Sequence, residues 1–294
     1  MIDVRSFLDY LAADKGCPQT TVRTYRESLE NLERYFRLLD DRLAWDNLDA
    51  DVVRRWMAER MKSGRSPRTV KRDMSAVRSF YRYLLRMQLV EKDPTQSIGN
   101  PKAAKPLPTF LKEQEMNRLF DEIIYPEGFE GLRDRTILLT FCHTGIRRAE
   151  LLGLTPDKVH LATGELKVFG KRSKERIVPF GGELQQALAE YVAARRDIMG
   201  GDGGPLFVNE NGRPVNEAKV AAIVRKYLSM VTIRKKKSPH VLRHTFATLM
   251  LNHGADLEAV KELLGHESLA TTEIYTHTTF ATLKKEYEHA HPRA

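Results

Sequence analysis

The chain has 294 residues, of which 41% are hydrophobic and 30% charged, so it can bury one large core or two ordinary ones. It has no apolar run near the ~20 residues of a membrane-spanning helix, no apolar signal-peptide core at its start, and only two cysteines, too few for a disulfide framework. A net charge of +9 favours a polyanionic partner. We therefore expect a cytoplasmic protein with no membrane anchor.

Residues 1–101 read as a helical domain, because apolar residues recur there at three- and four-residue intervals. The apolar stripes cover residues 4–11, 25–36, 52–57 and 70–84. The expected helix starts are Thr20 or Thr21 as cap of the second helix, Leu48-Asp49 before the third, and Ser66 as cap of the fourth, with Pro67 at its first position.

The fourth of these helices is basic on one face. From Lys62 to Arg86 there are eight basic residues and one acidic residue, Asp73. A solvated basic face is the ordinary interpretation of such a run. The scarcity of carboxylates, and two serines within the basic stripe, favour contact with nucleic-acid phosphates instead. The residues that we expect to bind DNA on this helix are Arg68, Arg72, Arg82 and Arg86.

A linker is expected over residues 102–110. The helical domain ends near Asp93-Pro94, and the stretch from Asn100 to Pro108 contains three prolines, which is typical of an extended connection. We therefore expect a second domain over residues 111–294.

The second domain reads as mainly helical with a small antiparallel sheet. Helices are expected to start at Lys112, to cover the buried run 133–142, and to follow Val215 or Asn216. Alternating residues predict a hairpin of strands 165–169 and 176–180, and a further short strand over 206–208.

Near the end of the chain, several residues with titratable side chains lie close together in the sequence. A helical period places His240, Arg243 and His244 on one face. The bland interpretation is a helical core with satisfied histidines. A zinc helix is a poor alternative, because Val241 stands where a metalloprotease needs its glutamate.

Two further candidates follow a short helix. Asp256 is expected to cap a helix over residues 257–264, and Gly265 to end it immediately before His266. Tyr275 comes nine residues later. A tyrosine with an ordinary pKa of about 10 is a weak nucleophile, but nearby cations can stabilise the charge of a phosphoryl transition state.

The order of these residues resembles the tyrosine site-specific recombinases. His240-Val241-Leu242-Arg243-His244, then Leu263-Leu264-Gly265-His266, then Tyr275 are most similar to the bacterial Xer recombinases, and the resemblance covers essentially the whole chain. It implies a helical SAM-like core-binding domain and a mixed α/β catalytic domain that close on DNA as a C-shaped clamp.

The resemblance also implies site residues further upstream. The family's first arginine stands in the context Thr144-Gly145-x-Arg, which gives Arg147 rather than Arg148, with Glu150 in support. The family's lysine follows a glycine in the hairpin turn, which gives Lys171. The usual Gly-Lys-Gly reads Gly-Lys-Arg here, so Lys174 remains an alternative.

The mechanism implied by the family assigns a role to each residue. Tyr275 attacks a DNA phosphate to form a 3′-phosphotyrosyl bond, while Arg147 and Arg243 hold the non-bridging oxygens. Lys171 is the general acid for the leaving 5′-hydroxyl. His240 accepts the tyrosine proton, and His266 binds the phosphate. Protein cations then serve where other enzymes use a metal, so neither metal, cofactor nor ATP is expected.

The expected partners are double-stranded DNA and further recombinase subunits. Lys235 and Lys236, just before His240, are expected to touch the DNA backbone. Phe280, Leu283 and Tyr287 share one face of a terminal helix, and the resemblance gives that face to a neighbouring subunit of a homo- or hetero-tetramer. A second recombinase and a DNA translocase are further partners that the family implies.

The expected role is exchange of strands through a Holliday junction, in Xer-type resolution of chromosome or plasmid dimers, with chromosome partition in cell division as its purpose. One alternative is another enzyme of the same chemistry, a mobile-element integrase or a topoisomerase. The absence of an arm-binding domain before the core-binding helices favours Xer over an integrase. A non-catalytic DNA-binding protein on the same fold is the alternative from another class.

Overall fold

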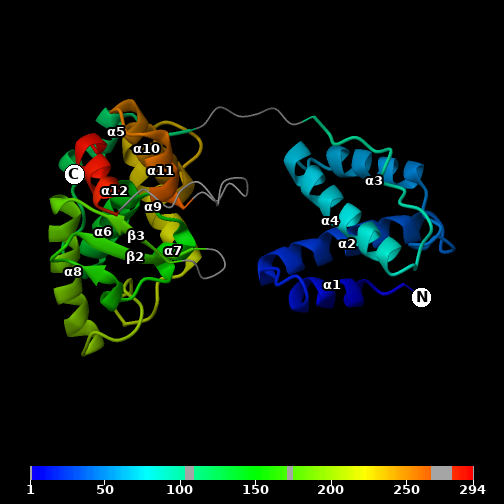
Figure 1. The fold of residues 1–294 in the computed structure, drawn as a ribbon, viewed down its shortest axis with the longest axis horizontal. Coiled ribbons are helices and arrows are strands. Elements are labelled where there is room, and N and C mark those ends of the chain that lie inside the picture. The colour runs from blue at the N-terminus through cyan, green and yellow to red at the C-terminus, as the bar shows by residue number, and fades with distance from the viewer. Residues whose placement is uncertain (1, 103–108, 171–174, 266–279, 294) are drawn as a thin grey trace. The chain divides into compact units, whose positions relative to one another are not determined.

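The computed structural model describes residues 2–102, 109–170, 175–265 and 280–293. The chain divides into two compact units, residues 1–106 and 107–294 (Figure 1). Lys171, Lys174, His266 and Tyr275 lie outside the described residues, as does most of the expected linker.

Unit 1 is built from helices, as its apolar periodicity predicts. They are α1 (Val4–Ala13), α2 (Gln19–Leu39), α3 (Ala50–Lys62) and α4 (Pro67–Arg86). The side chains of Asp49 and Ser66 cap α3 and α4 as expected, since they accept hydrogen bonds from Val52 N–H and Thr69 N–H.

The expected cap of α2 is wrong. The helix begins at Gln19, with Pro18 at the cap position, rather than after Thr20 or Thr21. Pro18 has extended backbone angles, and its carbonyl accepts the amides of Thr21 and Val22. Helical hydrogen bonding can therefore start before either threonine, and no side-chain cap is needed.

One carboxylate organises the core of unit 1. Asp73, the acidic residue of α4, is only 1% exposed. It accepts hydrogen bonds from Arg60 on α3, at 2.7 Å, and from Ser28 on α2, at 3.0 Å. A buried charge needs such partners, so Asp73 links the helices from inside. It also lies 3.4 Å from Nη2 of Arg72, on the exposed basic face.

Unit 2 is mainly helical. Its first helices are α5 (Glu113–Asn117), the π-helical turn η1 (Arg118–Glu122), α6 (Phe129–Thr144), α7 (Arg148–Leu152) and the 3₁₀ turn η2 (Pro156–Lys158). After the sheet come α8 (Gly182–Met199), α9 (Glu217–Val231), α10 (Pro239–Asn252), α11 (Leu257–Leu264) and α12 (Phe280–Ala290). The helix α6 is buried along most of its length and packs against both α8 and α10, so it forms the centre of the unit.

The sheet is small and antiparallel, with the order β1-β2-β3. Its strands are β1 (Val159–His160), β2 (Glu165–Phe169) and β3 (Glu175–Pro179). Leu166 pairs with Val178, and Val168 with Arg176, which confirms the expected hairpin. The strand expected over residues 206–208 is absent from the described residues: Val208 forms a single bridge with Pro214.

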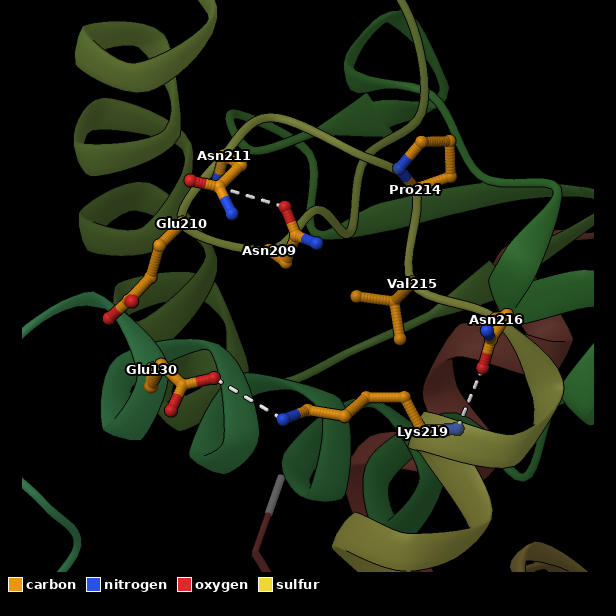
Figure 2. A pocket seen from close by; sticks show the side chains of 8 residues that line it. All are labelled: Glu130, Asn209, Glu210, Asn211, Pro214, Val215, Asn216 and Lys219. Carbon is orange, nitrogen blue, oxygen red and sulfur yellow. Dashed lines mark hydrogen bonds and ion pairs between the residues drawn. The ribbon is translucent and has the colours of Figure 1, made fainter.

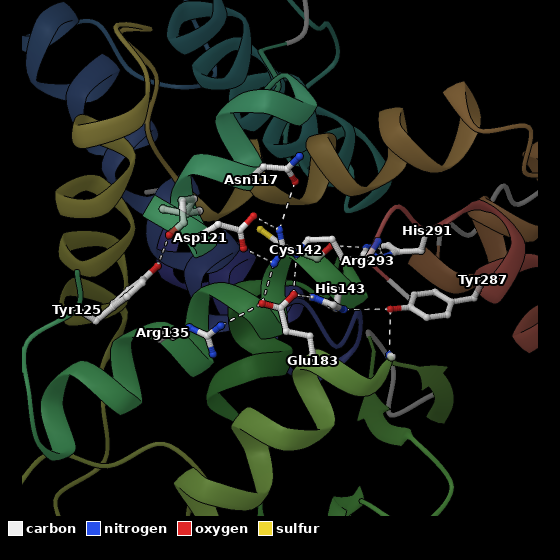
Figure 3. Close-up of polar contacts among 12 residues, drawn as sticks. Asn117, Asp121, Tyr125, Arg135, Cys142, His143, Glu183, Tyr287, His291 and Arg293 are labelled. Atoms are coloured by element: carbon white, nitrogen blue, oxygen red, sulfur yellow. Dashed lines mark hydrogen bonds and ion pairs between the residues drawn. The ribbon is translucent and has the colours of Figure 1, made fainter. Parts of the chain in front are cut away.

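The terminal helix α12 corrects a second expectation. Its apolar face was assigned to a neighbouring subunit, but Leu283 and Tyr287 are buried against this chain, in a cluster with Phe246 of α10 and Leu263 of α11. The Tyr287 hydroxyl accepts a hydrogen bond from Gly181 N–H at 3.2 Å and lies 3.3 Å from Nδ1 of His143 (Figure 3). In this chain, the face therefore packs against the rest of unit 2.

Ion pairs fasten the residues after α12. Arg293 donates to Asp121 at 2.7 Å and to Glu183 at 2.6 Å (Figure 3). Burial opposes ionisation of Glu183, but its contacts with His143 and Arg293 hold its pKa at about 2. Burial, reinforced by His143, lowers the pKa of His291 to about 3, and burial also lowers the pKa of His143.

This cluster predicts that unit 2 loses stability in acid before unit 1. An unfolded histidine titrates near 6.5, whereas buried His291 stays neutral down to about pH 3. The unfolded state therefore binds the extra proton, and stability falls as pH drops below 6.5, by up to about 1.4 kcal/mol per pH unit for one histidine. The expected result is a unit 2 melting transition, followed by calorimetry, that moves down steeply between pH 6.5 and 5.

Two controls make this test specific. Trp45 and Trp56 both lie in unit 1, so their fluorescence follows that unit separately. In His291→Gln the pH dependence of the unit 2 transition should flatten. An unchanged slope in that variant would show that His291 does not cause it.

Candidate active site

The site begins at the turn between α6 and α7. Gly145 ends α6 in the left-handed conformation, with φ +58°. A β-carbon at this position would lie 2.6 Å from Cδ1 of Phe246 and 2.8 Å from Cδ2 of Leu264. Glycine is therefore required both by the backbone and by the close approach of α10 and α11. The turn places Arg147 at the N-cap position of α7.

A single carboxylate binds two arginines. Glu150 accepts Nη1 of Arg147 at 2.8 Å, and Nη1 and Nη2 of Arg176 at 2.7 and 2.9 Å. Burial opposes ionisation of Glu150, but hydrogen bonds from Arg176 and Arg147 outweigh it and hold the pKa of this carboxyl below its usual value. Glu150 is therefore an anion that orients two cations.

Arg148, the sequence alternative to Arg147, points elsewhere. Its Nη2 donates to Glu217 at the start of α9, at 2.5 Å. Arg147 instead directs its second terminal nitrogen to the carbonyl of Gly265, at 2.7 Å. Of these two arginines, Arg147 is therefore the one that hydrogen-bonds to the end of α11.

Arg243 meets the same helix end from α10. Its residue is 8% exposed, and its terminal nitrogens donate to Gly145 O and Leu264 O, both at 2.6 Å. Burial, together with the charge of Arg147, lowers the pKa of Arg243 to about 10. It stays charged at neutral pH, and its described partners are carbonyls rather than a carboxylate. No carboxylate among the described residues forms a direct ion pair with it.

His240 stands at the second position of α10 and is exposed. Partial burial of its ring lowers its pKa below the usual 6.5, and the charges of Arg148 and Arg243 lower it further. The imidazole is therefore neutral at pH 7, the state in which it can accept a proton.

Gly265 ends α11, as the sequence predicted, in the left-handed conformation with φ +64°. It directly precedes His266, so the end of α11 fixes where the segment with His266 and Tyr275 starts. Arg147, Glu150 and Arg243 thus come together around Gly265, with His240 on the α10 that carries Arg243. The structural positions of Lys171, His266 and Tyr275 fall outside the described residues.

Sequence reasoning assigned no role to Arg176. A signal was available: on a strand, Arg176 shares a face with Val178, which is buried. An arginine on the core face of a strand needs a buried anion, and Glu150 is that anion.

The expected DNA-binding arginines of unit 1 are all exposed on α4: Arg68, Arg72, Arg82 and Arg86. Arg86 is also held in place, since it donates to the Tyr10 hydroxyl at 2.7 Å and its guanidinium carbon lies 4.3 Å from the centre of that ring. In unit 2, Lys235 and Lys236 are exposed in the connection between α9 and α10. Their contacts with DNA stay predictions.

Replacing Arg86 tests the basic face. If Arg86 binds a phosphate, Arg86→Ala should weaken DNA binding and lower the slope of log K against log salt by about 0.9. Arg42→Ala is the matched control, because Arg42 is exposed and paired with Asp40, and it removes the same charge. Filter binding at several salt concentrations measures both. Equal slopes for the two variants would show that Arg86 does not contact a DNA phosphate.

A cleft of about 330 Å³ lies apart from these residues (Figure 2). Asn209, Asn216 and Lys219 line it, and Lys219 pairs with Glu130 at 3.3 Å. None of the predicted site residues lines this cleft, so we assign it no part in the site.

No helix in the described ranges has the length and apolar character needed to cross a membrane. No group of three or more His, Cys, Asp or Glu residues there is arranged to hold a metal ion.

Comparison with known proteins places this chain, with its helical unit and its mixed unit, in the class of tyrosine recombinases. Residues 109–282 match the Phage integrase family, and residues 4–88 match the phage integrase N-terminal SAM-like domain. The chain therefore belongs to the phage integrase family, and it is a tyrosine recombinase of the Xer type.

Its relatives include both Xer types. The tyrosine recombinase XerC of Chlorobaculum tepidum is 38% identical, with 98% of this chain and 94% of that protein aligned. The tyrosine recombinase XerD of Pseudomonas aeruginosa is 40% identical, with 98% and 96% aligned. Among solved structures, XerH bound to its difH substrate before cleavage matches with a TM-score of 0.70 at 26% identity, covering 90% of this chain and 78% of that one.

The Tn1549 transposon integrase bound to circular-intermediate DNA matches with a TM-score of 0.72 at 20% identity, over 95% of this chain and 96% of that one. At that identity, the match shows a shared fold. The expected fold class, helical with a SAM-like first domain and a small antiparallel sheet, is confirmed.

Proposed function

We propose that this protein exchanges strands between double-stranded DNA sites through a 3′-phosphotyrosyl intermediate, in Xer-type resolution of chromosome or plasmid dimers. The observation that carries the proposal is the convergence of Arg147 and Arg243 on adjacent carbonyls, Gly265 O and Leu264 O. The segment with Tyr275 starts at the next residue. This convergence supports the proposal that both cations bind the phosphate that Tyr275 attacks.

The proposed reaction follows from what each group can do. Tyr275 attacks the phosphorus, the phosphodiester bond to the 5′-oxygen breaks, and Lys171 protonates the leaving 5′-oxygen to give a 5′-hydroxyl. Arg147 and Arg243 stabilise the charge that develops on the non-bridging oxygens, a role that fits paired guanidinium groups. Neutral His240 accepts the proton of Tyr275, and His266 donates to the phosphate. A 5′-hydroxyl of the partner duplex then attacks, which restores a phosphodiester without ATP or metal.

The proposal extends to assembly. We propose residues 1–101 as the core-binding domain, 102–110 as the linker and 111–294 as the catalytic domain, closing together on DNA in the cytoplasm. The exposed arginines of α4 would hold the phosphate backbone. A tetramer on two DNA sites, with or without a second recombinase and under a DNA translocase, would complete the reaction.

A nicked duplex that loses a short fragment on cleavage tests the chemistry. The expected result is a covalent protein–DNA band on a denaturing gel, formed in EDTA and without nucleotide. Candidate chromosomal dimer-resolution sites and mobile-element attachment sites are compared as substrates, with a relative's partner recombinase added. Absence of the band on every site despite DNA binding would favour a non-catalytic binding protein.

His240 predicts the pH dependence of cleavage. Because burial lowers its pKa from the usual 6.5, the imidazole should stay mostly neutral, and the rate of covalent-complex formation level, from pH 8 to 7. Below that range protonation removes the proton acceptor, and the rate should fall. In His240→Asn the rate should be low at every pH, with no acidic decline. If the acidic decline in rate persists in this variant, a group other than His240 causes that decline.

A further inference from the structure

Arg176 of β3 connects the candidate site to the end of α11. Its Nε donates to Leu263 O at 3.0 Å, while both terminal nitrogens bind Glu150. Its side chain is 15% exposed. A β-carbon on Gly265 would lie 3.0 Å from Nη1 of Arg176, so the glycine packs directly on the guanidinium.

The last carbonyls of α11 each accept a different arginine. Leu263 O binds Arg176, Leu264 O binds Arg243, and Gly265 O binds Arg147. Cations are favourable at this position, because the free carbonyls carry the negative end of the helix dipole. The end of α11 is therefore held by three guanidinium groups.

These arginines differ in the charge that they can offer to a phosphate. Arg176 gives both terminal nitrogens to Glu150, whereas Arg147 gives that carboxylate one. Arg243 binds carbonyls. The charge of Arg176 is thus neutralised by Glu150, and its Nε is bound to Leu263 O.

We infer that Arg176 is a positioning residue for strand cleavage. It orients Glu150, and through it Arg147, and it anchors the end of α11 from which the segment with His266 and Tyr275 starts. The inference rests on the proposed function, because the residues that Arg176 would position are those proposed to carry out strand cleavage. It requires a planar fork of donors, because one side chain must bind both carboxylate oxygens and a carbonyl at once.

Arg176→Lys separates charge from geometry, because lysine keeps the charge but cannot make all three bonds. The expected result is a rate of covalent-complex formation at saturating DNA that falls roughly 10- to 100-fold, as misplaced reacting groups produce. The dissociation constant for DNA should stay near that of wild type. Arg176→Gln should be slower still. Arg196→Lys is the control, since Arg196 forms an exposed ion pair with Asp202.

A double-mutant cycle shows whether Arg176 acts through Glu150. Arg176→Lys added to Glu150→Gln should slow cleavage by less than the product of the single effects, because the two residues share one interaction. Additive effects, a wild-type rate in Arg176→Lys, or a loss confined to DNA affinity would each overturn the inference. The last result would make Arg176 a phosphate ligand.

Hydrogen exchange separates failure of this inference from failure of the proposed function. The Gly265 amide donates to Glu262 O at the end of α11, and its exchange should quicken in Arg176→Lys without DNA. If wild type forms no covalent complex, the proposed function fails, while the exchange result still decides whether Arg176 anchors the helix. Unchanged exchange would contradict the anchoring.

Discussion

Tyr275→Phe should abolish the covalent protein–DNA complex and leave DNA binding close to wild type. The change removes one oxygen atom, which is the proposed nucleophile, and leaves the ring. Another group could replace this nucleophile only if it reached the same phosphate. A denaturing gel with the nicked duplex measures the complex, and gel shift under native conditions measures binding.

Tyr227→Phe is a matched control for that change. Tyr227 is a buried tyrosine of α9 whose hydroxyl donates to Asp134, so it loses the same atom away from the site. Its variant should still form the complex. A covalent band in Tyr275→Phe would assign the nucleophile to another residue and refute the proposed mechanism.

Arg147→Ala should slow strand cleavage by about 10²–10³-fold, the usual cost of losing one preorganised donor to a transition-state oxyanion. Arg148→Ala, one residue away, should cost far less at pH 8, because Arg148 pairs with Glu217 on α9 and not with the end of α11. The two variants remove equal charge from adjacent positions. Single-turnover cleavage at saturating DNA measures both.

Equal losses in the two variants would contradict the assignment of Arg147. They would mean that local charge, rather than the direction set by Glu150 and Gly265, matters for cleavage. A loss in Arg147→Ala that vanishes at high DNA concentration would point to binding in the ground state instead.

The terminal helix bears on how a tetramer could form. In the chain described here, Leu283 and Tyr287 are buried in cis, and Arg293 binds Asp121 and Glu183. A subunit contact through this face therefore competes with contacts that the chain already makes with itself, and acidic pH weakens those contacts.

Local patterns in the sequence determined much of this protein. Apolar periodicity predicts the helices, and Ser66, Asp256 and Gly265 mark helix ends that the structure confirms. These predictions succeed because a cap or a left-handed turn depends on a few neighbouring residues. The motif around His240 and Arg243 likewise identifies the family from residue order alone.

Only the tertiary structure decided which charges meet. Arg147 and Arg148 are adjacent in sequence, and the difference between them arises because Arg148 meets Glu217 of α9 whereas Arg147 meets the Gly265 carbonyl at the end of α11. Arg176 finds Glu150 across 26 positions. The face of α12 lacked a visible partner in sequence for the same reason: its partners on α10 and α11 are brought near by packing, which no local pattern records.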